Sequence, residues 1–250
     1  MPQIHRLYIP ELDPQKSTFE LTKPDVHVVA NVLRLAVGAD VVLLNGQGLE
    51  VQTRIASLTK HDIALEKQSM TQHALRQPKI HITVGALKGD KAAWIIQKLT
   101  EIGVARISWF QARFSIAKHK HEAQPKSNKL TKWQRVAIEA MRQSGNPYMP
   151  EIRMFKNLTE CMAEHEDNDI KICLHEKSDV GGFETIFQKP ARACHVMVGP
   201  EGGFSKDEVE MMKTKGYAAI HCAPFVLRSE TAAIYMASVL QAHVYSRSAM

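Results

Sequence analysis

The sequence predicts a two-domain protein in which a small β-rich domain precedes an α/β domain with a parallel sheet. Three observations support this prediction. Short apolar runs and polar turns fill the first seventy residues, apolar strands alternate with helical patterns after Pro78, and residues 67–78 show no periodicity and end in proline. A chain of 250 residues with 44% hydrophobic side chains can bury two cores. We therefore expect one domain over residues 1–72 and another over residues 73–250.

The N-terminal domain is predicted to be a small β-barrel. Asn45-Gly46 lies between two apolar runs and predicts a hairpin, because both positions of a tight turn of this kind need positive φ. One helix is expected around residues 27–35. Strands are expected at residues 6–9, 41–45, 49–55 and 63–65.

The C-terminal domain alternates strand and helix patterns. Asp90 can cap a helix that Gly103 ends, and a second helix from Ser127 to Gly145 buries an apolar stripe while presenting cations on its other faces. Helices between strands are the connections that parallel strands need, so the alternation predicts a parallel α/β sheet. Its strands are expected at residues 80–84, 106–110, 151–155, 170–174, 194–199 and 218–223.

The four cysteines are interpreted as reduced core thiols of a cytoplasmic protein. They are 12, 21 and 28 residues apart, contain no C-x-x-C pair and mostly lie in apolar runs, which favours this reading over metal ligation or disulfides. None lies beside a recognisable base, so a nucleophilic cysteine is not expected. His119 and His121 flank a lysine without further ligands nearby, so we expect no metal site. Residues 1–6 lack the apolar core of a signal peptide, and we expect neither export nor membrane insertion.

Positive charge is concentrated in the middle of the chain. Residues 79–156 carry 15 basic and 5 acidic side chains, a net charge of +10 within a chain of net charge +6. Such an excess fits contact with a polyanion, because Lys and Arg at phosphates release condensed counterions. A solvated basic face is the alternative interpretation.

A glycine-rich loop at Gly199-Pro-Glu-Gly-Gly203 joins a predicted strand to a predicted helix. Its spacing matches neither the dinucleotide fingerprint nor the phosphate-binding loop that ends in Gly-Lys-Ser/Thr, so a phosphate-bearing cofactor is disfavoured. Glycines allow a close backbone approach, which suits a neutral or cationic small molecule at the carboxyl edge of the sheet. Ser205 and Glu208 fit a capping box for the helix that follows, and Gly216 suits its C-terminal end. A tight turn without a ligand is the alternative.

A second polar segment precedes the last apolar helix. Arg228, Ser229, Glu230 and Thr231 follow one another directly, and Ser229 or Thr231 could cap that helix. Capping does not call for an arginine beside a glutamate, although an incidental surface ion pair would explain them. The segment therefore joins the glycine loop as a candidate binding region.

These two motifs together resemble those of the RsmE family of 16S ribosomal RNA (uridine-N3) methyltransferases, within the SPOUT superfamily. The motifs are Val-Gly-Pro-Glu-Gly-Gly-Phe-Ser at 198–205 and Val-Leu-Arg-Ser-Glu-Thr-Ala at 226–232. The resemblance extends in order along nearly the whole chain, through Arg6-Leu-Tyr-Ile, Asn45-Gly46, Trp94-Ile-Ile-Gln-Lys98, Thr100-Glu-Ile-Gly-Val104 and Gln143-Ser-Gly145. Alanine at 223, phenylalanine at 225, serine at 229 and proline at 2 depart from the family pattern, and Phe225 puts one RNA contact in doubt.

The resemblance implies a PUA-like RNA-binding barrel, a SPOUT-type parallel sheet with a C-terminal trefoil knot, a homodimer and S-adenosylmethionine (SAM) as cofactor. It also implies methylation of N3 of a uridine in the decoding region of 16S ribosomal RNA, expected to occur on the assembled small ribosomal subunit. Carried over by motif, the cofactor pocket would include Leu174, Gly199, Gly202, Gly203, Leu227, Arg228, Ser229, Thr231 and Ala232.

The expected chemistry assigns roles to three further candidates. Uridine N3 carries a proton, so the site must remove it or stabilise the resulting anion. Arg228 is the candidate for stabilising that charge, and Glu230 or Glu201 for accepting the proton or orienting Arg228. RNA contacts are expected from Arg6, Tyr8, Arg34, Lys88, Lys91, Arg113, Arg135 and Arg142, each of which could instead be a solvated charge or, for Tyr8, a structural residue. The rival interpretations are a SPOUT enzyme for another RNA, such as transfer RNA, and a non-catalytic RNA-binding or ribosome-assembly protein.

Overall fold

The computed structural model describes residues 4–23, 25–75, 77–88, 90–115, 128–178 and 191–248. The chain divides into two compact units. The N-terminal unit comprises Met1–Leu75 with Ile138–Met149, and the C-terminal unit comprises Arg76–Ala137 with Pro150–Met250. The sequence pattern did not predict that residues 138–149 would cluster with the first unit.

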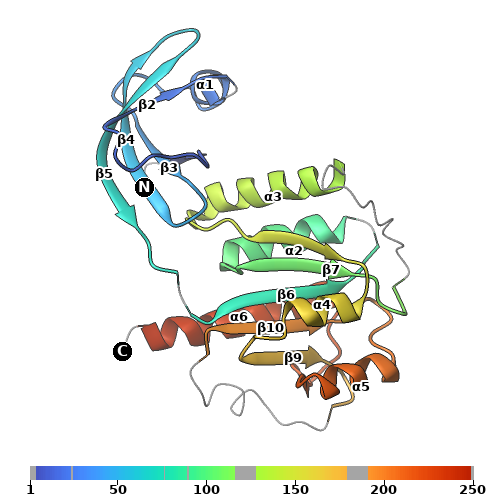
Figure 1. The fold of residues 1–250 in the computed structure, drawn as a ribbon. Coiled ribbons are helices and arrows are strands. Elements are labelled where there is room, and N and C mark those ends of the chain that lie inside the picture. Colours follow the sequence, from blue (N-terminus) through green and yellow to red (C-terminus); the bar gives the residue numbers. More distant parts are fainter. Residues whose placement is uncertain are drawn as a thin grey trace. The chain divides into compact units, whose positions relative to one another are not determined.

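The N-terminal unit is built on a mixed five-stranded sheet, drawn in blue to cyan in Figure 1. The strands follow the order β1-β3-β4-β5-β2, with β1 and β3 parallel and the other pairs antiparallel. Between β2 and β3 the chain forms a short α1 and a π-helical turn, η1. The elements are β1 (His5–Tyr8), β2 (Thr18–Leu21), α1 (Asp25–His27), η1 (Val28–Val32), β3 (Asp40–Leu44), β4 (Leu49–Leu58) and β5 (Ile63–Gln72).

The predicted hairpin at Asn45-Gly46 is confirmed, but it is wider than a two-residue turn. The side-chain oxygen of Asn45 accepts hydrogen bonds from the amides of Gln47 and Leu49 at 2.7 and 2.9 Å, and Gly46 and Gly48 have φ values of +73° and +94°. The Asn45 side chain therefore satisfies two turn amides itself, which is the usual reason for asparagine in such turns.

Three sequence predictions for this unit were incomplete or wrong. The helix expected around residues 27–35 begins earlier, at Asp25, is mostly π-helical and ends at Val32, and Arg34 has the left-handed φ of +54°. Residues 67–72 are not a connector, because β5 continues through them to Gln72. The four-residue β2 was missed, since a strand of that length gives too little alternation to be recognised.

The C-terminal unit contains the predicted parallel sheet, with six strands in the order β11-β9-β10-β6-β7-β8 and every pair parallel. The strands are β6 (Lys79–Gly85), β7 (Arg106–Phe110), β8 (Glu151–Phe155), β9 (Ile170–Leu174), β10 (Ala193–Val198) and β11 (Ala218–Ile220). The helices are α2 (Lys91–Ile102), α3 (Asn128–Ser144), α4 (Leu158–Glu164), α5 (Lys206–Thr214) and α6 (Ser229–Ser248). Residues of α3 up to Ala137 belong to this unit.

Helices cover both faces of this sheet. Leu158 and Cys161 of α4 and Val209 of α5 join sheet residues such as Met197 in one buried cluster. Helix α6 contacts β6 and β10 and packs against α2, and Figure 1 shows α4 in front of the sheet and α6 behind it. Among the helices of the described residues, none is long and apolar enough to span a membrane.

Candidate active site

A cavity of about 840 Å³ lies at the carboxyl ends of three adjacent strands of the C-terminal unit. Leu174, Val198 and Ile220, near or at the ends of β9, β10 and β11, contribute to its wall. The carboxyl edge is where open parallel α/β sheets bind ligands, because the loops that leave the strands converge there. The volume falls in the range of small-molecule and cofactor sites.

The glycine loop, Gly199–Gly203, forms one wall of this cavity. A β-carbon on Gly199 would lie 3.1 Å from Gly203 Cα, and one on Gly202 would lie 2.8 Å from Phe114 Cβ. The Gly203 amide donates to the Pro200 carbonyl at 2.9 Å. The glycines therefore let the loop fold tightly on itself and pack against Phe114, and they leave its backbone free to approach a ligand.

The predicted capping box fixes where the glycine loop ends. The Ser205 amide donates to Glu208 Oε2 at 2.8 Å, and the Glu208 amide donates to Ser205 Oγ at 3.3 Å. Helix α5 then runs to Thr214, and Gly216 follows with a left-handed φ of +82°. The backbone of Arg113 donates to Glu208 Oε1 at 2.9 Å, so the capping carboxylate also holds the chain after β7.

The segment before α6 forms the opposite wall. Leu227, Arg228, Ser229 and Ala232 line the cavity, whereas Thr231 is exposed and does not line it. Ser229 is the first residue of α6, and the Arg228 carbonyl accepts a hydrogen bond from the Ala232 amide at 2.8 Å. Arg228 rather than Ser229 therefore occupies the cap position. Among the described residues, the Arg228 guanidinium has no ion pair or hydrogen bond and is exposed at the cavity.

Lys91 connects the two predicted catalytic glutamates. Its Nζ lies 3.1 Å from Glu201 Oε1 and 3.3 Å from Glu230 Oε2, and Glu201 Oε1 also accepts from the Lys88 amide at 3.3 Å. The Glu230 contact is an ion pair without hydrogen-bond alignment. Burial acts to raise the pKa of Glu201, but hydrogen bonds from its own amide, Lys91 and Lys88 lower it overall. Glu201 is therefore a poor proton acceptor in this arrangement.

The residues predicted to contact RNA differ in how far their side chains are already engaged. Arg6 and Arg142 bond to each other's backbone: Arg142 Nε donates to the Arg6 carbonyl at 2.7 Å, and Arg6 donates to the Arg142 carbonyl at 3.4 Å. Arg113 pairs with Asp207 at 2.7 Å, and Tyr8 packs against the small cluster that contains Met141.

Lys88, Arg34 and Arg135 are exposed, and their side chains have no ion pair or hydrogen bond within the described part of the chain. His119 and His121 lie outside the described residues.

Comparison with known proteins identifies the family. Residues 75–241 match the model of an RNA methyltransferase domain, and residues 21–68 match that of an RNA methyltransferase PUA domain. Ribosomal RNA small subunit methyltransferase E of Bacillus subtilis (strain 168) is 29% identical over 230 residues, which cover 89% of each chain. The chain belongs to the RsmE family of RNA methyltransferases.

Other members extend the similarity. The enzyme of the same name from Buchnera aphidicola (subsp. Acyrthosiphon pisum) is 27% identical over 241 residues, covering 96% of this chain and 93% of its own. A solved methyltransferase from Legionella pneumophila, with SAM bound, is 30% identical with a TM-score of 0.82, covering 96% of this chain and 98% of its own. A ribosomal RNA small subunit methyltransferase E from Neisseria gonorrhoeae, 24% identical, shares the fold with a TM-score of 0.84, covering 96% of this chain and 98% of its own. The predicted PUA-like domain and parallel α/β domain are therefore those of the RsmE family.

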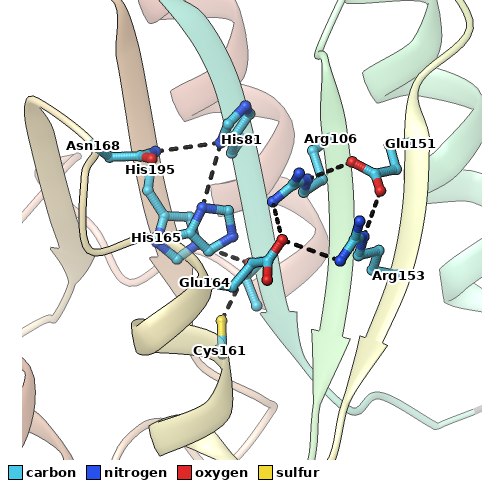
Figure 2. Close-up of polar contacts among 10 residues, drawn as sticks. His81, Arg106, Glu151, Arg153, Cys161, Glu164, His165, Asn168 and His195 are labelled. Atoms are coloured by element: carbon cyan, nitrogen blue, oxygen red, sulfur yellow. Dashed lines mark hydrogen bonds and ion pairs between the residues drawn. The ribbon is translucent and has the colours of Figure 1, made fainter.

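A second polar group, the histidine cluster of His81, His165 and His195, was missed by the sequence reasoning. It lies near the amino ends of β6 and β10, where His81 and His195 are register partners and His165 follows α4 (Figure 2). The rings of His165 and His195 stack with centroids 3.6 Å apart. Histidines distributed singly over three elements carry no local signal, so only the sheet register brings them together.

Burial keeps the histidine cluster neutral, and hydrogen bonds orient its rings. His81 Nδ1 lies 3.2 Å from Asn168 Nδ2 and 3.3 Å from His165 Nδ1, while His195 contacts Thr83 Oγ1 at 2.8 Å and Tyr217 Oη at 2.7 Å. Burial, followed by the charges of Arg106 and Lys79, lowers the pKa of His81 to about 4. Burial, then His81 and Arg106, lowers the pKa of His165 to about 3, and burial lowers that of His195 well below its ordinary value.

This cluster is a weak candidate metal centre. Cys161, His165 and His195 offer ligand atoms within 4.8 Å of one another. However, the two imidazole planes lie only 20° from parallel, and both nitrogens of His195 already have partners. Stacked rings direct their lone pairs side by side rather than to one point, and burial raises the pKa of the Cys161 thiol to about 12. The charges of Arg106 and Arg153, which pair with Glu151 and Glu164 beside the cluster in Figure 2, also disfavour a cation.

Proposed function

We propose that this protein transfers a methyl group from SAM to RNA and that the cavity at the carboxyl ends of β9, β10 and β11 holds the cofactor. The observation that carries the proposal is the meeting of the glycine loop and the segment before α6 in one cavity. Membership of the RsmE family and the SAM-bound relative of 30% identity support the same assignment.

The residues of the cavity fit SAM. Leu174, Val198, Ile220 and Leu227 offer apolar surface for an adenine, and the backbone of the glycine loop offers amides and carbonyls. The charged side chains of the lining are of both signs, Lys91, Lys177, Lys206 and Arg228 against Glu176 and Glu201, so the fit to SAM rests on the apolar surface and the loop backbone rather than on net charge. When bound, SAM supplies a methyl group that is already activated for transfer.

The proposed substrate is a uridine N3 in 16S ribosomal RNA of the small ribosomal subunit. The name that the relatives share supports ribosomal RNA of the small subunit, and the excess of basic residues over positions 79–156 supports a polyanionic partner. The uridine, its position in the decoding region and action on the assembled subunit rest on the family resemblance.

Arg228 is the proposed catalytic residue. Its guanidinium lines the cavity without a partner among the described residues, so its donors are available to the oxygens of a uracil whose N3 loses a proton. Glu230, with a side chain 13% exposed beside Lys91, keeps the proposed role of accepting that proton or orienting Arg228. The lowered pKa of Glu201 favours a structural role for it instead.

A cytoplasmic homodimer with a C-terminal trefoil knot completes the proposal. Helix α6 exposes two aromatic side chains, Tyr235 at 41% and Tyr245 at 54%, and Trp94 of the adjoining helix α2 is 45% exposed. Large aromatic side chains that are exposed on two packed helices favour a protein partner, so a second copy is their proposed cover. Light scattering after size exclusion tests this part, and a monomer at micromolar concentration would contradict it.

Methyl mapping tests the function. The protein is incubated with SAM and either small ribosomal subunits or naked 16S RNA that lack the modification, and the new methyl group is located by mass spectrometry. Methylation of one uridine at N3 is expected. A methyl on another base or another RNA would favour a different SPOUT activity, and calorimetry without SAM binding would favour a non-catalytic RNA-binding protein.

An arginine variant tests the catalytic assignment. Arg228→Ala is expected to lower the single-turnover rate about 100-fold or more, in line with loss of one donor to a developing oxyanion. Arg192→Ala serves as the control, because it removes an exposed arginine just before the amino end of β10, whereas the cavity lies at the carboxyl end of that strand. A normal single-turnover rate for Arg228→Ala would refute the assignment.

A further inference from the structure

The structure assigns Lys91 as a positioning residue that holds the two walls of the cofactor cavity together through Glu201 and Glu230. This inference rests on the proposed function, and it replaces an RNA contact as the main role of Lys91. The three residues come from separate elements: Lys91 begins α2, Glu201 lies in the glycine loop and Glu230 lies in the first turn of α6. We call this trio the Lys91 bridge.

The Lys91 bridge consists of two short ion pairs between partly buried side chains. The ammonium of Lys91 lies 3.1 Å from Glu201 and 3.3 Å from Glu230, and the side chains of the three residues are only 33%, 26% and 13% exposed. Ion pairs at this depth are screened less by water and salt than pairs on the open surface. Although burial acts to lower the pKa of Lys91, its contacts with the two carboxylates raise it, so its charge is retained.

Helix stability does not explain Lys91. As the first residue of α2, it places a cation at the end of the helix where the macrodipole is positive, which is unfavourable. The first turn of α2 contains no acidic residue, and the N-cap residue, Asp90, makes no capping hydrogen bond with its side chain. The compensation comes from two glutamates, one in the glycine loop and one in the first turn of α6, and Glu201 also accepts from the Lys88 amide just before α2. The contacts of the Lys91 ammonium with Glu201 and Glu230, rather than the stability of α2, therefore explain a lysine at this position.

Without Lys91, two carboxylates would face each other across the cavity edge with no cation between them. Their repulsion would push the glycine loop away from α6, and SAM binds between these two walls in the proposed function. Removing the charge of Glu201 would relieve that repulsion. A lysine that only contacts RNA phosphates would show no such compensation.

Calorimetry with SAM tests the bridge. Lys91→Met is expected to weaken SAM binding about tenfold, a loss of the size that contacting partners show in mutant cycles. Lys91→Arg is expected to retain most of the affinity, and the double variant Lys91→Met with Glu201→Gln to recover part of the loss. Lys98→Met, which removes a lysine that pairs with Glu101 within the same helix, is the matched control and should bind as the wild type does.

Two outcomes would overturn the inference. They are wild-type SAM affinity in Lys91→Met, with or without weaker RNA binding, and a loss of SAM affinity that Glu201→Gln does not relieve. If the wild-type protein does not bind SAM, the proposed function itself is contradicted. In that case the bridge is judged by urea unfolding of the same variants, where additive effects of Lys91→Met and Glu201→Gln would overturn it.

Discussion

Lowering the pH from 7 to 5 is expected to destabilise the C-terminal unit by several kcal/mol through the histidine cluster. The pKa values of His81 and His165 in the folded chain are about 4 and about 3, against about 6.5 in an unfolded chain. Because the folded values are depressed, the unfolded chain binds protons first. The stabilisation is fully present above about pH 6.5 and is lost as the pH falls toward the folded pKa values.

The magnitude follows from linkage. Between pH 7 and pH 5 each of these two histidines lowers the free energy of unfolding by about 2 kcal/mol. The pair therefore lowers it by about 4 kcal/mol, out of a typical value of about 5–15 kcal/mol. The geometry explains the cost. His81 Nδ1 faces the donor Asn168 Nδ2 at 3.2 Å, and His165 Nε2 is buried without a hydrogen-bond partner in the described structure. A proton on His165 Nε2 would find no acceptor, a proton on His81 Nδ1 would face only His165 Nδ1 at 3.3 Å, and Arg106 and Lys79 repel the added charge at His81.

Tryptophan fluorescence during urea unfolding measures this effect in the correct unit, because all three tryptophans, Trp94, Trp109 and Trp133, belong to the C-terminal unit. The unfolding free energy is expected to fall between pH 7 and pH 5 in the wild type and to fall less steeply in His81→Gln. His221→Gln removes an exposed histidine of the same unit and should keep the wild-type slope. A flat profile for the wild type, or an unchanged slope in His81→Gln, would refute the reasoning.

Three further predictions concern the glycine loop, its cap and the basic residues. Gly85→Ala is expected to destabilise the C-terminal unit by about 1–3 kcal/mol and to weaken SAM binding, because its β-carbon would lie 2.5 Å from Pro200 Cδ; unchanged unfolding and calorimetry would contradict this. Ser205→Ala is expected to cost about 1 kcal/mol in urea unfolding through loss of the capping box, and Ser246→Ala at the exposed end of α6 should cost much less. Arg135→Met is expected to reduce the slope of log affinity for RNA against log salt by about 1, whereas Arg142→Met should mainly lower stability because Arg142 bonds to the Arg6 carbonyl; equal effects of the two variants on the slope would be inconsistent with these roles.

The sequence by itself determined those features whose cause is local. Strand alternation, the Ser205 capping box, the asparagine of the Asn45 turn and the glycine loop were readable because each depends on residues a few positions apart. The order of the strands was not readable, but their parallel arrangement followed from the helices between them. Eight of the nine residues that the family resemblance implied for the cofactor pocket line the cavity, whereas other lining residues such as His175, Lys177 and Ile220 were not predicted.

Only the tertiary structure decided which charges meet. Lys91 and Glu201 are 110 positions apart, and Thr83 and His195 are 112 apart, yet each pair is in contact. No periodicity predicts such pairs, since they depend on the order in which strands are placed side by side. For the same reason the sequence left Glu201 as a cofactor neighbour, a proton acceptor or a structural residue, and the contact with Lys91 favours the structural role. The fold also separates residues that are neighbours in the sequence. Thr231 is turned away by its helix from the cavity that Ser229 and Ala232 line.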